Sequence, residues 1–240
     1  MPNNYFQFKQ FIIYHDKCAM KVGTDGVLLG AWTSSILEGK ILDIGTGSGL
    51  IAIMSAQKNL NAIIDAVEID LDSVIQAKEN ANNCPWSNRI KIYHDSFQNF
   101  SKRTHKYSLI TSNPPYFNNS LLPDKKSRSK ARHTLSLNYE ELLQGASILL
   151  EQNGIFSVII PYDSANEFIE KALNFGLYCK RNCLVYPTPQ SNPKRVLLDF
   201  SPNKNVVSFF KNEKIIIEEF GRHKYSEKYI SLTKNFYLNL

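Results

Sequence analysis

Three carboxylates and a glycine-rich turn occur at positions where they could share one ligand. Asp43 ends a short apolar run just before the turn Gly45-Thr46-Gly47-Ser48-Gly49, and Glu68 and Asp95 each follow another apolar run. Glycines permit a tight turn and let a ligand approach the backbone closely. The spacing differs from the Gly-x-Gly-x-x-Gly of dinucleotide enzymes, and the nearby carboxylate favours a cationic ligand over a pyrophosphate.

S-adenosylmethionine has the groups that such residues would bind. Its amino and sulfonium groups are cationic, which suits an acidic turn. Glu68, followed by Ile69, could accept hydrogen bonds from both ribose hydroxyls. Asp95 could accept one from the adenine amino group, with Ser96 beside it and Phe97 packing on the ring. We therefore expect this cofactor at the ends of three successive strands.

A fourth apolar run, residues 107–112, is followed by Asn113-Pro114-Pro115-Tyr116. Asn-Pro pairs favour turns, so a plain loop is one interpretation. An aromatic amine is a weak nucleophile because its lone pair is shared with the ring. The Asn113 side-chain carbonyl and the Pro114 backbone carbonyl could accept its two N–H groups, aim the lone pair at a methyl donor, and leave Tyr116 to stack on the base. Such a reaction depends on orientation, so we expect these four residues to be catalytic.

The elements that position these residues form an α/β pattern. Strands are expected at residues 40–44, 63–68, 90–93, 107–112, 154–160, 177–186 and 195–200. Helices are expected at residues 50–57, 71–81, 139–150 and 164–175. This alternation predicts a mostly parallel sheet with helices on both faces, in which the fourth strand lies beside the first where ligands bind.

The remaining segments are expected to belong to the same single domain of residues 1–240. Residues 1–39 would form an N-terminal extension on the cofactor and substrate side, and residues 40–201 the catalytic core. Residues 202–240 would form an appendage, with one or two strands within 206–219 and an amphipathic helix at 225–238.

The positive charge of this chain is concentrated in one segment. The 240 residues carry a net charge of +6, and five cations lie in the eight residues 125–132: Lys125, Lys126, Arg128, Lys130 and Arg132. Basic runs are usually solvated surface. This one follows the Asn-Pro-Pro-Tyr turn, where the phosphates of a flipped-out nucleotide would pass, so we expect it to contact RNA.

Several other classes of protein are disfavoured. No apolar run is long enough to cross a bilayer, and the N-terminus lacks the pattern of a signal peptide. The four cysteines are scattered and the histidines show no metal-ligand spacing, so neither disulfides nor a metal site is expected. We expect a cytoplasmic protein that binds no metal and no membrane.

Together these motifs resemble a known family. The glycine turn and Asn-Pro-Pro-Tyr are similar to those of class I methyltransferases that act on amino or amide nitrogen. Residues 6–11, 15–32, 65–70, 85–90, 195–198 and 225–227 resemble the bacterial valine-tRNA adenine-37 N6-methyltransferases. The block MKVGTDGVLLGAW at residues 20–32 is the most specific of these segments.

The resemblance implies a Rossmann-like fold with a seven-stranded sheet in the order 3-2-1-4-5-7-6, the last strand antiparallel. It implies S-adenosylmethionine as cofactor, bound also by Lys21, Thr24, Asp25 and Asn113. It further implies a monomer that methylates N6 of the adenosine beside the anticodon of valine tRNA.

Two alternatives stay open. Release-factor glutamine methyltransferases have nearly the same two motifs, although they carry a helical domain before the glycine turn, where this chain has only about forty residues. DNA or ribosomal RNA could also be the adenine-containing substrate. A binding module without catalysis would have no need for an intact Asn-Pro-Pro-Tyr turn.

Overall fold

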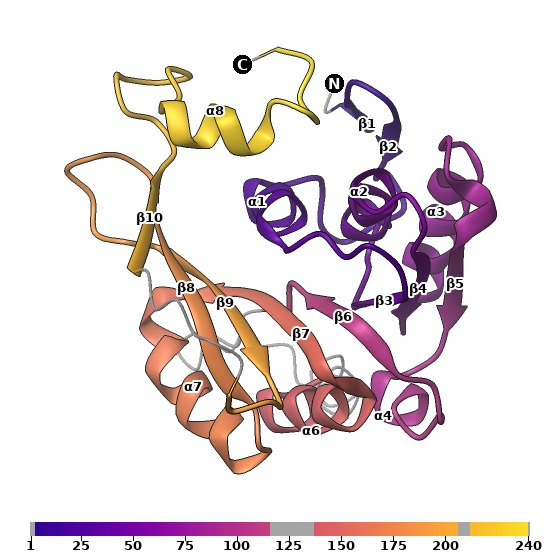
Figure 1. Cartoon of the computed structure of the whole chain (residues 1–240). Coiled ribbons are helices and arrows are strands. Elements are labelled where there is room, and N and C mark those ends of the chain that lie inside the picture. Colours follow the sequence, from indigo (N-terminus) through magenta and orange to yellow (C-terminus); the bar gives the residue numbers. More distant parts are fainter. Residues whose placement is uncertain (1–2, 116–136, 206–211, 240) are drawn as a thin grey trace, which may run out of the picture.

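The computed structural model of this chain describes residues 3–115, 137–205 and 212–239. Within these residues a twisted sheet forms the middle layer and helices cover both of its faces (Figure 1). A separate hairpin of β1 (Tyr5–Gln7) and β2 (Ile12–Tyr14) precedes the sheet. The expected α/β architecture is confirmed.

The order of the strands matches the expected topology. The sheet contains β3 (Lys40–Ile44), β4 (Ile63–Glu68), β5 (Ile90–His94), β6 (Tyr107–Ser112), β7 (Leu150–Pro161), β8 (Tyr178–Tyr186), β9 (Arg195–Ser201) and β10 (Asn212–Ile216). Their order is β10-β8-β9-β7-β6-β3-β4-β5. Read from the β5 edge and without β10, this is 3-2-1-4-5-7-6, and β9 is the antiparallel strand.

The sheet in the described residues has one more strand than the seven expected. β10 pairs in parallel with β8, which places Ile215 beside Val185, and both side chains are buried. We expected one or two strands in this part of the chain, but as an appendage. A pattern of apolar residues indicates a strand without indicating its neighbour, because the pairing is made by distant segments.

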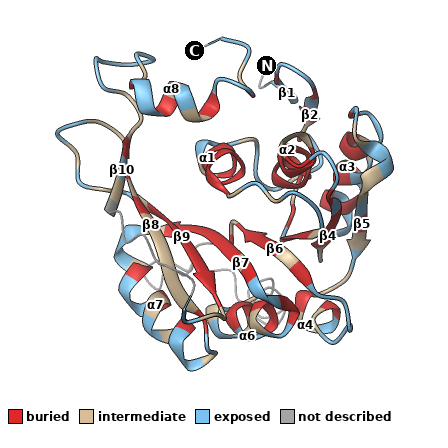
Figure 2. Ribbon diagram, viewed as in Figure 1, coloured by how far each residue is buried: buried red, intermediate tan, exposed pale blue. Residues whose placement is uncertain are grey.

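Helices form the two outer layers (Figure 1). One face of the sheet is covered by α1 (Thr24–Trp32), α2 (Leu50–Lys58) and α3 (Leu71–Asn82), and the other by α4 (Phe97–Phe100), α6 (Tyr139–Leu149) and α7 (Ala165–Asn174). Residues buried between the layers are red in Figure 2. Strands covered on both faces are apolar almost throughout, which explains the continuous apolar runs of the sequence. No helix in the described part of the chain is long and apolar enough to cross a membrane.

The C-terminal helix is shorter than expected. α8 covers Glu227–Thr233, and the following residues turn to meet the N-terminal hairpin. Lys9 N donates to Phe236 O at 2.7 Å, and Phe8 forms a bridge with Tyr237. The two ends of the chain therefore pack against each other, beside α1 and α2.

Candidate active site

The turn after β3 presents bare backbone to open space. Gly45 and Gly47 have φ angles of +68° and +54°, and a Cβ at either would meet no atom within 4 Å. Gly49 differs, because a Cβ there would contact Ala77 of α3 at 3.4 Å. Left-handed backbone favours glycine, and the missing side chains leave room for a ligand against Gly45 and Gly47.

Asp43 lies behind this turn. Its side chain is fully buried and accepts hydrogen bonds from Thr46 Oγ1 at 2.6 Å and from Thr111 Oγ1 at 3.0 Å. These bonds connect the turn to β6. We expected Asp43 to attract a cationic ligand, but it lines neither of the cavities described below. Its hydrogen bonds hold the turn in place, and its contribution to binding a cationic ligand stays a prediction.

The burial of Asp43 gives a testable pH dependence. Burial raises the pKa of its carboxyl from 3.8 to about 7, opposed by the hydrogen bonds from Thr46 and Thr111. Because the pKa is higher in the folded state, the contribution to stability is full below pH 3.8 and is lost as pH rises through about 7. As pH rises from 5 to 8, the free energy of unfolding should therefore fall less in Asp43→Asn than in the parent, as measured by urea titration at each pH.

The parent itself is the control for this prediction. Burial also raises the pKa of Asp199, to about 6, and that group titrates in both proteins. An equal loss of unfolding free energy in parent and variant would show that Asp43 does not contribute to the pH dependence.

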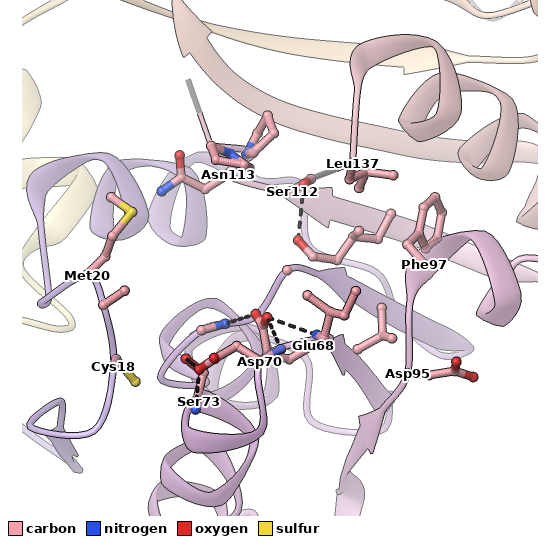
Figure 3. A pocket seen from close by; sticks show the side chains of 18 of the residues that line it. Cys18, Met20, Glu68, Asp70, Ser73, Asp95, Phe97, Ser112, Asn113 and Leu137 are labelled. Atoms are coloured by element: carbon pink, nitrogen blue, oxygen red, sulfur yellow. Dashed lines mark hydrogen bonds between the residues drawn. The ribbon is translucent and has the colours of Figure 1, made fainter. Parts of the chain in front are cut away.

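Glu68 ends β4 and is oriented by backbone groups. Its Oε2 accepts from Gly47 N at 2.9 Å, and its Oε1 accepts from Ile69 N at 2.9 Å and Asp70 N at 3.0 Å (dashed lines in Figure 3). A carboxylate has about four acceptor sites, so three such bonds leave capacity for a ligand hydroxyl. The glycine turn and Glu68 thus form one connected structure.

Asp95 follows β5 beside Glu68. Arg103 Nη2 lies 3.2 Å from Asp95 Oδ2, and the guanidinium lies over the rings of Tyr93 and Phe100 at 4.7 Å and 4.3 Å. Asp95 N donates to Glu68 O at 3.0 Å, which joins the ends of the two strands. The ion pair holds the Asp95 carboxylate at the rim of the cavity.

These residues surround a cavity of about 470 Å³ at the carboxyl ends of β3, β4, β5 and β6 (Figure 3). Its apolar wall includes Ile44, Val67, Phe97 and Leu137. A second cavity of about 370 Å³ is lined by residues 20–26 and the glycine turn. Both cavities share four lining residues: Met20, Gly45, Gly47 and Asn113. No cluster of three or more metal-ligating side chains occurs within the described ranges.

Most of the residues expected to bind the cofactor line one of these cavities. The first cavity contains Gly45, Gly47, Glu68, Ile69, Asp95, Phe97 and Asn113, together with Pro114 and Pro115. The second adds Lys21, Thr24, Asp25 and Thr46. Three expected residues line neither: Asp43, Gly49 and Ser96. Tyr116, Lys125, Lys126, Arg128, Lys130 and Arg132 lie outside the described residues.

Ser96 and Gly49 act at the starts of helices. Ser96 Oγ accepts from Asn99 N at 3.2 Å and caps α4, which carries Phe97 to the cavity wall. Gly49 is the residue before α2. Each thus sets the start of a helix that adjoins the cavities and does not line them.

Sequence reasoning placed residues 1–39 on the cofactor side but did not single out Cys18 and Met20, which line the first cavity. Cys18 and Met20 face the first cavity across from Asp70 and Ser73 (Figure 3). The only available signal was the proximity of these residues to Lys21 in the chain. Cys18 and Met20 reach the cavity through a tertiary contact, and the pattern of apolar and polar residues in this segment does not predict that contact.

Comparison with known proteins confirms the family resemblance. The family model described as methyltransferase small domain matches residues 20–174. The tRNA1(Val) (adenine(37)-N6)-methyltransferases of Phocaeicola vulgatus and Bacteroides fragilis are each 48% identical to this chain, over 244 and 242 residues. Both alignments cover 100% of this chain and 100% of the relative.

Solved structures share the fold at low sequence identity. A predicted O-methyltransferase from Agrobacterium tumefaciens has a TM-score of 0.68 at 19% identity, covering 88% of this chain and 96% of that one. A 16S rRNA methyltransferase of T. thermophilus, in complex with AdoMet and guanosine, has a TM-score of 0.57 at 15% identity, covering 83% and 51%. The chain belongs to the methyltransferase small domain family and, within it, to the family of the tRNA1(Val) (adenine(37)-N6)-methyltransferases.

Proposed function

We propose that this chain transfers a methyl group from S-adenosylmethionine to N6 of an adenosine in tRNA, namely adenosine 37 of tRNA1(Val). The observation that supports this most directly is the position of Asn113, which lines both cavities at the end of β6. A substrate amine bound by Asn113 would therefore lie between the first cavity and the second. The relatives that are 48% identical over their full length bear the name of this reaction.

The residues of the first cavity fit the nucleoside part of S-adenosylmethionine. Glu68 would accept hydrogen bonds from the ribose hydroxyls, Asp95 would accept one from the adenine amino group, and Phe97 would pack on the ring. The open space beside Gly45 and Gly47 would take the methionine part. When bound, this cofactor supplies an electrophilic methyl group on a cationic sulfonium, and neighbouring carboxylates favour that charge.

The residues after β6 would orient the target amine. Ser112 Oγ donates to Ile44 O at 3.1 Å, which ties the start of this turn to β3. Pro114 and Pro115 restrict the backbone beyond it. The Asn113 side-chain carbonyl and the Pro114 carbonyl would then accept both N–H groups of the adenine amine. A strong general base is unnecessary, because the nitrogen loses its proton readily once methylated.

The test is methyl transfer from labelled S-adenosylmethionine to bulk tRNA that lacks this modification and, in parallel reactions, to ribosomal RNA, DNA and protein, followed by nucleoside analysis of the nucleic acids. Label in N6-methyladenosine of valine tRNA is the expected result. Label entering protein would replace the proposal with a glutamine-amide methyltransferase. Label entering only ribosomal RNA or DNA would retain the adenine chemistry and overturn the tRNA substrate.

The basic segment is proposed to bind tRNA phosphates. Replacing Lys125, Lys126, Arg128 and Lys130 together by Gln should weaken tRNA binding and flatten its salt dependence, since each lost phosphate contact reduces the slope by about 0.7 to 0.9. Binding measured between 50 and 200 mM salt checks this. A variant with Lys78, Lys204, Lys214 and Lys224 each replaced by Gln loses the same four charges at exposed sites elsewhere and controls for net charge. An unchanged slope in the quadruple variant would refute the phosphate contacts.

We also propose that residues 1–240 act as one domain, as a monomer in the cytoplasm. The pairing of β10 with β8 and the contact of Lys9 with Phe236 support a single folding unit. One cooperative unfolding transition and a monomer mass by light scattering are the expected results.

A further inference from the structure

Helix α3 carries polar side chains on a face that is buried. Ser73, Gln76 and Asn80 are 6%, 0% and 0% exposed, and their spacing of three and four places them on one side of the helix. A buried helix face is ordinarily apolar, because a buried polar group without a partner is costly. Ser73 Oγ donates to Asp70 Oδ2 at 2.8 Å, at the N-cap of the same helix. Gln76 and Asn80, here called the polar ladder, have partners outside the helix.

The partners are backbone groups of residues 14–18, which connect β2 to the cavity wall. Asn80 pairs with Tyr14 in both directions: Tyr14 N donates to Oδ1 at 2.9 Å, and Nδ2 donates to Tyr14 O at 2.8 Å. Lys17 N donates to Gln76 Oε1 at 3.2 Å. The helix therefore offers this segment the hydrogen bonds that a neighbouring strand would otherwise provide.

Asn80 has one further contact, which reaches the glycine turn. Its Nδ2 also donates to Ser48 O at 2.8 Å. One buried amide thus bridges the N-terminal segment and the turn that faces both cavities. A few residues beyond Tyr14, Cys18 and Met20 form the wall opposite Asp70 and Ser73 (Figure 3).

The polar ladder adds buried hydrogen bonds to the other attachments of the N-terminal segment, which include the Lys17–Glu79 ion pair and the packing of Phe8, Phe11 and Ile13 in the core. β1 and β2 form a sheet of their own, separate from the main sheet. The backbone N–H groups of His15 and Cys18 donate to Asn4 O and His15 O, within the same N-terminal segment. The polar ladder is therefore a direct link between this wall and the core.

We propose that Asn80 is a positioning residue for the cofactor. It sets the N-terminal wall of the first cavity against the glycine turn, and Gln76 supports the same segment. The proposal rests on S-adenosylmethionine as the cofactor of the proposed function, and it is independent of which RNA accepts the methyl group.

The test compares two buried asparagines. Asn80→Leu removes the bridge while keeping a side chain of four heavy atoms that branches at Cγ. Asn59→Leu is the matched control, because Asn59 is 1% exposed, accepts from Ile36 N at 2.7 Å and donates to Ser55 O at 2.7 Å, yet lines neither cavity. Both variants lose a buried amide and its backbone bonds, so a purely structural cost should be shared.

The main readout is the Kd for S-adenosylmethionine by calorimetry, at a temperature where both variants are folded by circular dichroism. Asn80→Leu should raise the Kd by about 10-fold or more, by analogy with the loss of affinity when residues that orient metal ligands are replaced. Asn59→Leu should change the Kd by less than about twofold, as expected for a site without shared partners. Equal Kd values in the two variants would overturn the proposal.

Hydrogen exchange of the cofactor-free proteins gives an independent readout. Amides of residues 14–20 should exchange faster in Asn80→Leu, with β3 and β6 as in the parent, and unchanged exchange there would also overturn the proposal. Should Asn80→Leu fail to fold, Gln76→Met removes the acceptor for Lys17 N and the donor to Glu79 Oε2 while leaving Asn80 in place, and the same local loss of protection is expected. A parent that binds no S-adenosylmethionine would overturn the cofactor, while the exchange comparison would still decide the role of the ladder.

Discussion

Replacing Asn113 by Ala should slow methyl transfer by at least about 100-fold, because misplacement of a reacting group by about 1 Å has that effect. The Kd for S-adenosylmethionine should change by less than about threefold, since the cofactor contacts at Glu68 and Asp95 remain. Asn113 lines both cavities, so its side chain is placed to act on a group between them. Single-turnover kinetics measure the first quantity and calorimetry the second.

Asn203→Ala is the control for this experiment. Asn203 follows β9, an antiparallel strand that ends beside the start of β7, and its Nδ2 donates to Asn153 Oδ1 of β7 at 2.7 Å. This variant should transfer methyl groups at the parent rate. Activity of Asn113→Ala near the parent level would refute the proposed orientation of the amine.

Glu68→Gln should raise the Kd for S-adenosylmethionine by about 10- to 100-fold, the effect of losing one hydrogen bond to a charged group. Three backbone N–H groups converge on the two carboxylate oxygens of Glu68. A glutamine must set its NH₂ against at least one of them, so the side chain loses both its charge and its orientation. Calorimetry with the parent and the variant measures the difference.

Asp72→Asn controls for the loss of a nearby negative charge. Asp72 lies exposed in the first turn of α3 and lines neither cavity, so the Kd should stay at the parent value. Saturating cofactor should restore the methyl transfer rate of Glu68→Gln, whereas it should leave Asn113→Ala slow. A parent-like Kd for Glu68→Gln would remove Glu68 from the proposed cofactor contacts.

The strands and helices of the core were predictable because their signals are local. Helices expected at residues 50–57 and 71–81 occur at Leu50–Lys58 and Leu71–Asn82. Continuous apolar runs predicted the strands. The rules for connecting parallel strands leave few topologies to consider. Because parallel strands end at one edge, Glu68, Asp95 and Asn113 were expected to meet, and they line one cavity.

Asp43 shows what residue type and position alone do not distinguish. Its position at a strand end suggested contact with a cation, and residue type alone does not distinguish a carboxylate on a wall from one behind it. The hydroxyls of Thr46 and Thr111 each donate to one of its two oxygens inside the protein. One of these partners is 68 residues away, beyond the range of any local pattern.

The sequence by itself determined the succession of elements, the glycine turn, the carboxylates after the strands and the family of the chain, since each depends on neighbouring residues. Only the tertiary structure decided that β10 joins β8, that Cys18 and Met20 form a cavity wall, and that Asn80 links this wall to the turn. These features arise when buried polar and backbone groups from distant segments satisfy one another's hydrogen bonds. That requirement applies to the folded chain as a whole and leaves no periodic trace in any one segment.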